Sequence, residues 1–210
     1  MDTLAEEAEV RCLWSVIAFV CYNVGDKGAY AVKYYYYWLA VFVFVVDFLS
    51  KKWIEHSVAL DEQKHVIGDF FVITSVRNKG AAFSILQNQR LFFVAITIVV
   101  VVGILWYIMR IRNSGRVLLL AGLGMVLGGA LGNFLERALY GQVVDFLQFT
   151  FGSYVFPIFN LADSGIFVGV VLILLDAFIT SKKENGDSNE RKEQDGQDEL
   201  DGQQGTQFIQ

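Results

Sequence analysis

Four stretches of the sequence are apolar around the whole circumference of a helix. They cover residues 34–50, 91–109, 117–135 and 164–180, and each holds at most one charged side chain. A helix needs about 17–25 such residues to cross the roughly 30 Å hydrocarbon core of a bilayer. A surface helix would instead show one polar face, which these stretches lack. The pattern predicts a membrane α-helical protein with a bundle of four transmembrane helices.

The third of these stretches is unusually rich in small residues. Its five glycines are Gly122, Gly124, Gly128, Gly129 and Gly132. Small residues allow helix backbones to approach closely inside a membrane. We therefore expect this helix to pack tightly against its neighbours.

A fifth apolar run, residues 13–24, is too short to span a bilayer as a regular helix. Its length is typical of a signal-peptide core, but the residues before it are acidic where a basic segment is expected. We therefore expect residues 1–33 to form an extension that lies at the membrane surface or is partly inserted. A fifth span is the alternative.

Composition agrees with a membrane protein whose net charge lies at one end of the chain. Of the 210 residues, 54% are hydrophobic and 19% are charged, with a mean hydropathy of +0.43. Soluble domains are usually about 45–50% apolar and about 25% charged. The net charge is −5, but residues 181–210 alone hold eight acidic and four basic side chains. Such a segment cannot bury a core, so we predict a disordered acidic tail after a membrane domain at 34–180.

Other classes of partner find little support in the sequence. No basic stripe indicates nucleic-acid binding. Cys12 and Cys21 have neither the spacing nor a nearby histidine for a zinc site or a disulfide framework, and we interpret them as small apolar residues. The expected partners are membrane lipids, with a monomeric protein as the default.

Basic residues in the short loops predict the orientation. Arg110, Arg112 and Arg116 fall within seven residues, so the loop between the second and third helices should be cytoplasmic. Both termini are then cytoplasmic as well. The long connection at 51–90 should face outside, although it holds six basic residues.

With this topology, most of the polar residues near the membrane gather at its outer face. Ionisable groups there are costly and usually face a bundle interior or a wet cavity. The helix ends and outer loops that meet there contribute Asp47, Lys51, Arg77, Asn78, Asn133, Glu136, Arg137, Asp145, Asn160 and Asp163.

Several of these residues also have a purely structural interpretation. Asp47 and Lys51 have the i, i+4 spacing of a helical ion pair. Asn160 could cap the fourth helix, and Asp163 could complement the dipole of the same helix. Arg137 could extend to the lipid headgroups.

Three further polar residues are not expected to take part in chemistry. Asp176 should lie about 20 Å deeper along the fourth helix, near the cytoplasmic surface. His56 and His65 are expected in the first outer loop and have no partners at a useful spacing.

The chemistry that remains is that of two carboxylates, Asp145 and Asp163. The sequence has no Gly-x-Ser-x-Gly or Ser-x-x-Lys motif, no metal-binding helix and no P-loop. Two close aspartates cannot both ionise easily, so they share a proton. The ionised one can take a proton from attacking water, and the other can donate to the developing oxyanion. This hypothesis requires no metal and no organic cofactor.

Four segments resemble the bacterial lipoprotein signal peptidase (signal peptidase II) family. The matching segments, in the family's order, are VVDFLSK at 45–51, RNKGAAFS at 77–84, GGALGNFLER followed by GQVVDF between 128 and 146, and FPIFNLADS at 156–164. Together they are specific, and the resemblance covers roughly residues 37–179.

The resemblance implies a four-helix aspartic endopeptidase of the bacterial inner membrane, with a small β-rich platform on its outer side. It implies a catalytic pair of Asp145 and Asp163, with Asp47 and Lys51 in support. The residues that it places around the substrate are Asn78, Gly80, Asn133, Arg137 and Asn160. The implied substrate is a prolipoprotein that carries diacylglycerol on the cysteine after the cut site.

The sequence departs from the family pattern at Glu136, where an aspartate is usual. We expect the longer carboxylate to keep a supporting role by holding Arg137 toward the substrate. Two alternatives stay open: an inactive relative that binds lipidated peptides, and a membrane scaffold or transporter subunit. A transporter would be expected to show internal repeats and polar residues near mid-bilayer, and neither is evident.

Overall fold

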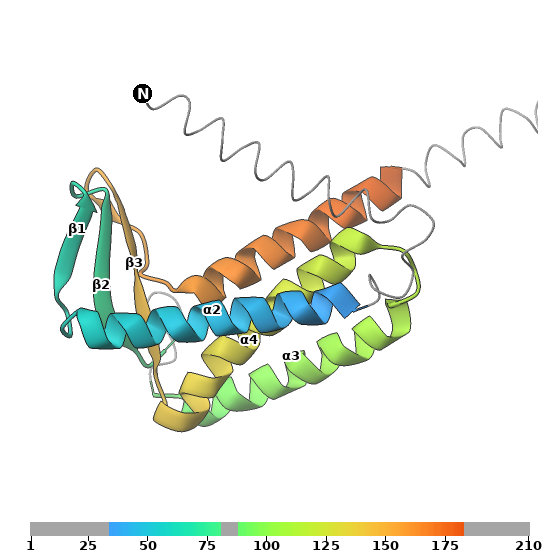
Figure 1. Cartoon of the computed structure of the whole chain (residues 1–210), viewed down its shortest axis with the longest axis horizontal. Helices are drawn as coiled ribbons and strands as arrows, with labels where there is room; N and C mark the ends of the chain where they lie inside the picture. The colour runs from blue at the N-terminus through green and yellow to red at the C-terminus, as the bar shows by residue number, and fades with distance from the viewer. Residues whose placement is uncertain (1–33, 81–87, 183–210) are drawn as a thin grey trace, which may run out of the picture.

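The computed structural model describes residues 34–80 and 88–182 of the chain. Figure 1 shows an elongated helical bundle with a small sheet at one end. The extension at 1–33, with Cys12, Cys21 and the apolar run at 13–24, lies outside the described residues. The same holds for the tail from residue 183 onward.

The four apolar stretches are all helical, and each helix is longer than its stretch. The bounds are α2 Tyr35–Ser57, α3 Arg90–Ile111, α4 Val117–Tyr140 and a last helix Leu161–Lys182. Because α2 continues through His56, the expectation that this histidine lies in a loop was wrong. The last helix likewise takes in residues 181 and 182, which we had assigned to the tail.

Within the described ranges, three helices are long and apolar enough to cross a membrane: α3, α4 and Leu161–Lys182. The helix α2 is not among them. Its exposed side chains include Trp38 and Phe42, and it buries Asp47 and Lys51. Two of its charged residues therefore face the protein, while Lys52 and Glu55 near its C-terminal end are partly exposed.

The helix α4 packs between α2 and the last helix, and its glycines make this possible. A Cβ at Gly124 or Gly128 would collide with the backbone of α2 at Tyr36 or Ala40. A Cβ at Gly122 would lie 2.5 Å from the carbonyl oxygen of Gly169 in the last helix. The close packing predicted for this stretch is confirmed.

The sheet is antiparallel, with strands in the order β1-β2-β3-β4. Their bounds are β1 Gln63–Ile67, β2 Phe71–Asn78, β3 Val143–Phe151 and β4 Tyr154–Val155. Arg77, Asn78 and Asp145, which we had expected in loops, lie on β2 and β3. Strand pairing sets Val76 opposite Asp145 and Arg77 opposite Val144.

The sheet is attached to the bundle through a small apolar core. Ile54 and Val58, at the end of α2, pack against Val144 and Phe146 of β3. This contact holds β3, the strand that carries Asp145, across the ends of α2 and α4 (Figure 1). The positions of Asn78 and Asp145 relative to the helices are fixed by it.

Candidate active site

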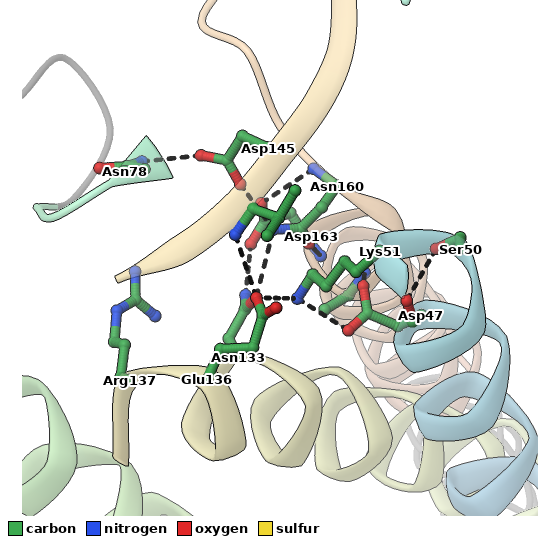
Figure 2. Close-up of polar contacts among 12 residues, drawn as sticks. Asp47, Ser50, Lys51, Asn78, Asn133, Glu136, Arg137, Asp145, Asn160 and Asp163 are labelled. Atoms are coloured by element: carbon green, nitrogen blue, oxygen red, sulfur yellow. Dashed lines mark hydrogen bonds and ion pairs between the residues drawn. The ribbon is translucent and has the colours of Figure 1, made fainter. Parts of the chain in front are cut away.

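Asp145 and Asp163 meet at one cavity of about 340 Å³ where the sheet joins the bundle. Asp145 lies on β3, and Asp163 lies in the first turn of the last helix (Figure 2). The structure thus brings together the two carboxylates that the sequence analysis selected. The cavity is also lined by Asn78, Asn133, Arg137, Asn160, Val143 and the segment 156–159.

Asp145 is buried and accepts a hydrogen bond on each of its oxygens. Asn78 Nδ2 donates to Oδ2 at 2.8 Å, and Asn160 Nδ2 donates to Oδ1 at 2.7 Å. Burial and, to a smaller extent, the negative charge of Asp163 raise the pKa of Asp145 to about 7, against the opposing effect of the two amide hydrogen bonds and of Lys51. A carboxyl group with this pKa can hold a proton near neutral pH.

Asp163 and Asn160 cap the last helix reciprocally. The backbone N–H of Asp163 donates to Asn160 Oδ1 at 3.0 Å, and the N–H of Asn160 donates to Asp163 Oδ2 at 3.3 Å. This is a capping-box arrangement, in which each side chain satisfies the other residue's free backbone donor. The predicted cap at Asn160 is confirmed, and the same side chain also contacts Asp145.

Asn133 links Asp163 to a buried cation. Its Nδ2 donates to Asp163 Oδ1 at 2.8 Å, and its Oδ1 accepts from Lys51 Nζ at 2.9 Å (Figure 2). Lys51 also pairs with Asp47 at 2.8 Å, which confirms the predicted i, i+4 ion pair. Asp47 in turn accepts from the backbone N–H of Ala162 at 2.8 Å, so this pair fixes the start of the last helix.

The expectation that Glu136 holds Arg137 was wrong. Neighbouring residues on a helix point in different directions, so their side chains do not face each other. Glu136 Oε2 instead lies 3.2 Å from Lys51 Nζ and accepts from the backbone N–H of Val144 at 3.0 Å. Its carboxylate therefore joins α2, α4 and β3.

Arg137 points toward the cavity and is held by other contacts. Its Nη2 donates to the carbonyl oxygen of Gly80 at 3.2 Å, and its guanidinium lies 4.7 Å from the centre of the Phe93 ring. Gly80 does not line the cavity. Its N–H donates to Asn78 Oδ1 at 2.9 Å, which turns the Nδ2 of Asn78 toward Asp145.

Arg77, next to Asn78, does not join this site. Successive side chains on a strand point to opposite faces. Arg77 lines a separate cavity of about 280 Å³ and pairs with Glu55 at 3.2 Å.

The remaining polar residues lie elsewhere. Asp176 pairs with Arg116, with Arg116 Nε 2.7 Å from its Oδ2, at the end of the bundle away from the sheet. His65 lies on the exposed strand β1 beside Asp69. Among residues 34–80 and 88–182, no three His, Cys, Asp or Glu side chains come close enough to hold a metal ion.

The apolar wall of the cavity was not predicted from the sequence. Val143 and the residues from Phe156 to Phe159 form this wall, and Phe156 packs edge-on against Phe159 with ring centres 5.8 Å apart. These residues lie in or beside the segments used for the family resemblance. Their aromatic character, so close to Asn160, was the signal that could have indicated a binding wall.

Comparison with known proteins identifies the same part of the chain. The family model described as signal peptidase (SPase) II matches residues 39–179. A lipoprotein signal peptidase of Brevibacillus brevis is 49% identical over 149 residues, which are 71% of this chain and 98% of that protein. A lipoprotein signal peptidase of Bacillus pumilus is 44% identical over 149 residues, covering 71% of this chain and 96% of the relative.

Solved structures also resemble the fold. A bacterial membrane enzyme solved by the in meso method at 2.3 Å resolution superposes with a TM-score of 0.64 and 36% identity. The match covers 69% of this chain and 88% of the other. A second such structure, at 1.9 Å resolution, gives a TM-score of 0.59 and 38% identity over 65% of this chain and 88% of its own.

Proposed function

The chain belongs to the signal peptidase II family, which removes signal peptides from prolipoproteins, and from this premise we propose that it is an aspartic endopeptidase with Asp145 and Asp163 as its catalytic pair. The observation that carries the proposal is the shared cavity. Both carboxylates line it, and neutral amides orient each of them. Such an arrangement suits acid–base chemistry on a bound peptide bond.

The pair works as one acid and one base. With a pKa of about 7, Asp145 can carry the proton that two close carboxylates share. The ionised partner takes a proton from water while the water oxygen attacks the scissile carbonyl carbon. The protonated partner gives its proton to the carbonyl oxygen, which forms a neutral tetrahedral intermediate.

The substrate is a prolipoprotein with diacylglycerol on the cysteine that follows the cut site. Support comes from the family resemblance and from the cavity itself, whose wall combines Arg137 with Val143 and Phe156. Apolar groups suit the peptide near its lipid, while Arg137 and the asparagines suit peptide carbonyls.

The helix α2 is proposed as a fourth span. It packs along α4, which is apolar enough to cross a membrane, and its exposed side chains include Trp38 and Phe42. The arginines near the α3–α4 connection favour a cytoplasmic location for the end away from the sheet. The site then faces outward from the bacterial inner membrane, with both termini in the cytoplasm.

The direct test is cleavage of a diacylglyceryl-modified prolipoprotein by the purified full-length chain in lipid vesicles. We expect a product whose new N-terminus is the lipidated cysteine, identified by mass spectrometry. The matched control is the same prolipoprotein without diacylglycerol, which should be cut poorly. Tight binding of the lipidated substrate without cleavage would instead indicate an inactive relative.

A further inference from the structure

Lys51 contacts two carboxylates, which balance its positive charge, and one neutral side chain in addition. The side chain is buried, and its ammonium group contacts Asp47 Oδ2 at 2.8 Å and Glu136 Oε2 at 3.2 Å. These two carboxylates already offset the charge. The third contact, at 2.9 Å, goes to the neutral side chain of Asn133.

That third contact extends the influence of the cation to one catalytic candidate. Asn133 accepts from Lys51 through Oδ1 and donates to Asp163 Oδ1 through Nδ2. In a low-dielectric interior, hydrogen bonds in series polarise one another. An amide whose oxygen is bound to a cation is a stronger donor through its nitrogen, so Asp163 receives a stronger hydrogen bond.

Asp145 is linked to the cation less directly. Of its two donors, Asn160 also donates to Asn133 Oδ1 at 3.2 Å, the atom that accepts from Lys51, but neither Asn78 nor Asn160 accepts a hydrogen bond from a cation among the described residues. The charge of Lys51 lowers the pKa of Asp145, but burial and the charge of Asp163 outweigh it. Asp163 additionally lies in the first turn of the last helix, where the helix dipole favours a negative charge. The two carboxylates are therefore held in different electrostatic surroundings.

We propose that Lys51 is a positioning residue that assigns the roles within the pair, making Asp163 the base and Asp145 the proton carrier by acting through Asn133. The assignment rests on the proposed aspartic mechanism. The raised pKa of Asp145 agrees with it.

The assigned roles give a balanced reaction. Asp163 takes one proton of the water as the water oxygen bonds to the carbonyl carbon, and Asp145 gives its proton to the carbonyl oxygen. As the carbon–nitrogen bond breaks, Asp163 returns its proton to the leaving nitrogen. One hydroxyl of the intermediate gives its proton to Asp145, and the pair is restored.

The charged groups around Lys51 define the variant that tests this role. They are Asp47 on its own helix, Glu136 on α4 and Asp145 on β3, with Asp163 reached through Asn133. Replacing Lys51 alone would leave buried carboxylates without a partner. The test variant is therefore Asp47→Asn/Lys51→Met, which removes one charge of each sign, while Glu136 keeps the backbone N–H of Val144 as a donor.

The readout is the pH dependence of kcat and KM in vesicles with a lipidated prolipoprotein. We expect kcat to fall about tenfold with little change in KM, because a poorer base slows the chemical step. The acidic limb of the kcat/KM profile should move about one unit toward higher pH, because the donor to the base is no longer polarised by a cation. Asn133→Leu removes the hydrogen bond to Asp163 together with the link, so adding Asp47→Asn/Lys51→Met to Asn133→Leu should move the limb little further.

The matched control is Arg116→Gln/Asp176→Asn, which removes an ion pair from the other end of the bundle. The acidic and alkaline limbs of the kcat/KM profile of this variant should coincide with those of the wild type. Unchanged limbs in a folded Asp47→Asn/Lys51→Met variant, or an equal shift when residue 133 is already leucine, would overturn the role of Lys51 and leave the proposed function standing. A wild type that does not cleave would overturn the proposed function and this inference with it.

Discussion

The two ends of the bundle each join helices through an ion pair, yet they differ in what surrounds the pair. At the end away from the sheet, Asp176 and Arg116 bind each other beside an apolar core that includes Leu119 and Leu120. At the sheet end, Lys51 contacts two carboxylates and an asparagine, and the network continues to two further aspartates.

The difference lies in which groups are left able to react. Asp176 is paired with a guanidinium, so its carboxylate is engaged directly by a cation. Asp145 and Asp163 accept hydrogen bonds mainly from neutral amides and line a cavity of about 340 Å³. A buried ion pair alone is weak evidence of function. Carboxylates without a direct cation, placed on a cavity, are much stronger evidence.

The largest effect should come from neutralising the proposed pair. Asp145→Asn and Asp163→Asn should each reduce turnover at least about a thousandfold, because asparagine neither accepts nor carries the catalytic proton. Cleavage at equal membrane abundance is the measurement. Asp69→Asn, at an exposed position in the turn between β1 and β2, is the matched control and should stay near wild type. Near-normal turnover in either catalytic variant would remove that residue from the mechanism.

The next effect concerns pH. Because the pKa of Asp145 is raised to about 7, its proton is present below this pH and is lost as the pH rises through it. If Asp145 carries the catalytic proton, kcat/KM should fall about tenfold for each pH unit above the pKa of Asp145. A pH–rate profile in vesicles from pH 5 to pH 9 tests this. A flat profile up to the alkaline end would contradict the assignment.

Much of this site could be predicted from the sequence because its parts obey local rules. The i, i+4 spacing of Asp47 and Lys51 specified their pair, and Asn160 followed by Asp163 specified a helix cap. The four helices followed from apolar runs that were long enough to span.

What could not be predicted depends on contacts distant in sequence. Glu136 was assigned to the wrong partner, because its true partners, Lys51 and the backbone of Val144, come from other elements. The strand pairing that brings Asn78 to Asp145 is also long-range, and the connections around them had been read as loops. Only the family resemblance indicated a β-rich platform.

A smaller effect should follow from changing Glu136, which contacts Lys51 but does not line the cavity of Asp145 and Asp163. Glu136→Gln should lower turnover about tenfold and reduce stability, because Lys51 loses a charged partner in a buried place. Glu136→Asp keeps the charge and should cost less, although its shorter chain must still reach Val144. Turnover and thermal unfolding of both variants are the measurements.

The control for Glu136 is Glu55→Gln at the same end of the bundle. Glu55 pairs with Lys52 and Arg77 in a partly exposed position, so its loss should change turnover less than about twofold. Equal turnover in Glu136→Gln and the wild type would show that the charge at this position has no role in catalysis.

The smallest effect on turnover should come from the opposite end. Asp176→Asn leaves Arg116 without its carboxylate, so thermal stability should fall, by about 1 kcal/mol because the arginine is partly exposed. Turnover and the limbs of the pH profile should stay within about twofold of wild type, because no chain of hydrogen bonds leads from Asp176 to the described cavity residues. Measuring stability and turnover on the same preparation separates the two effects. If Asp176→Asn shifted the pH limbs as strongly as the loss of Lys51, the two ends would be electrostatically coupled, and the distinction between a structural pair and a functional network would fail.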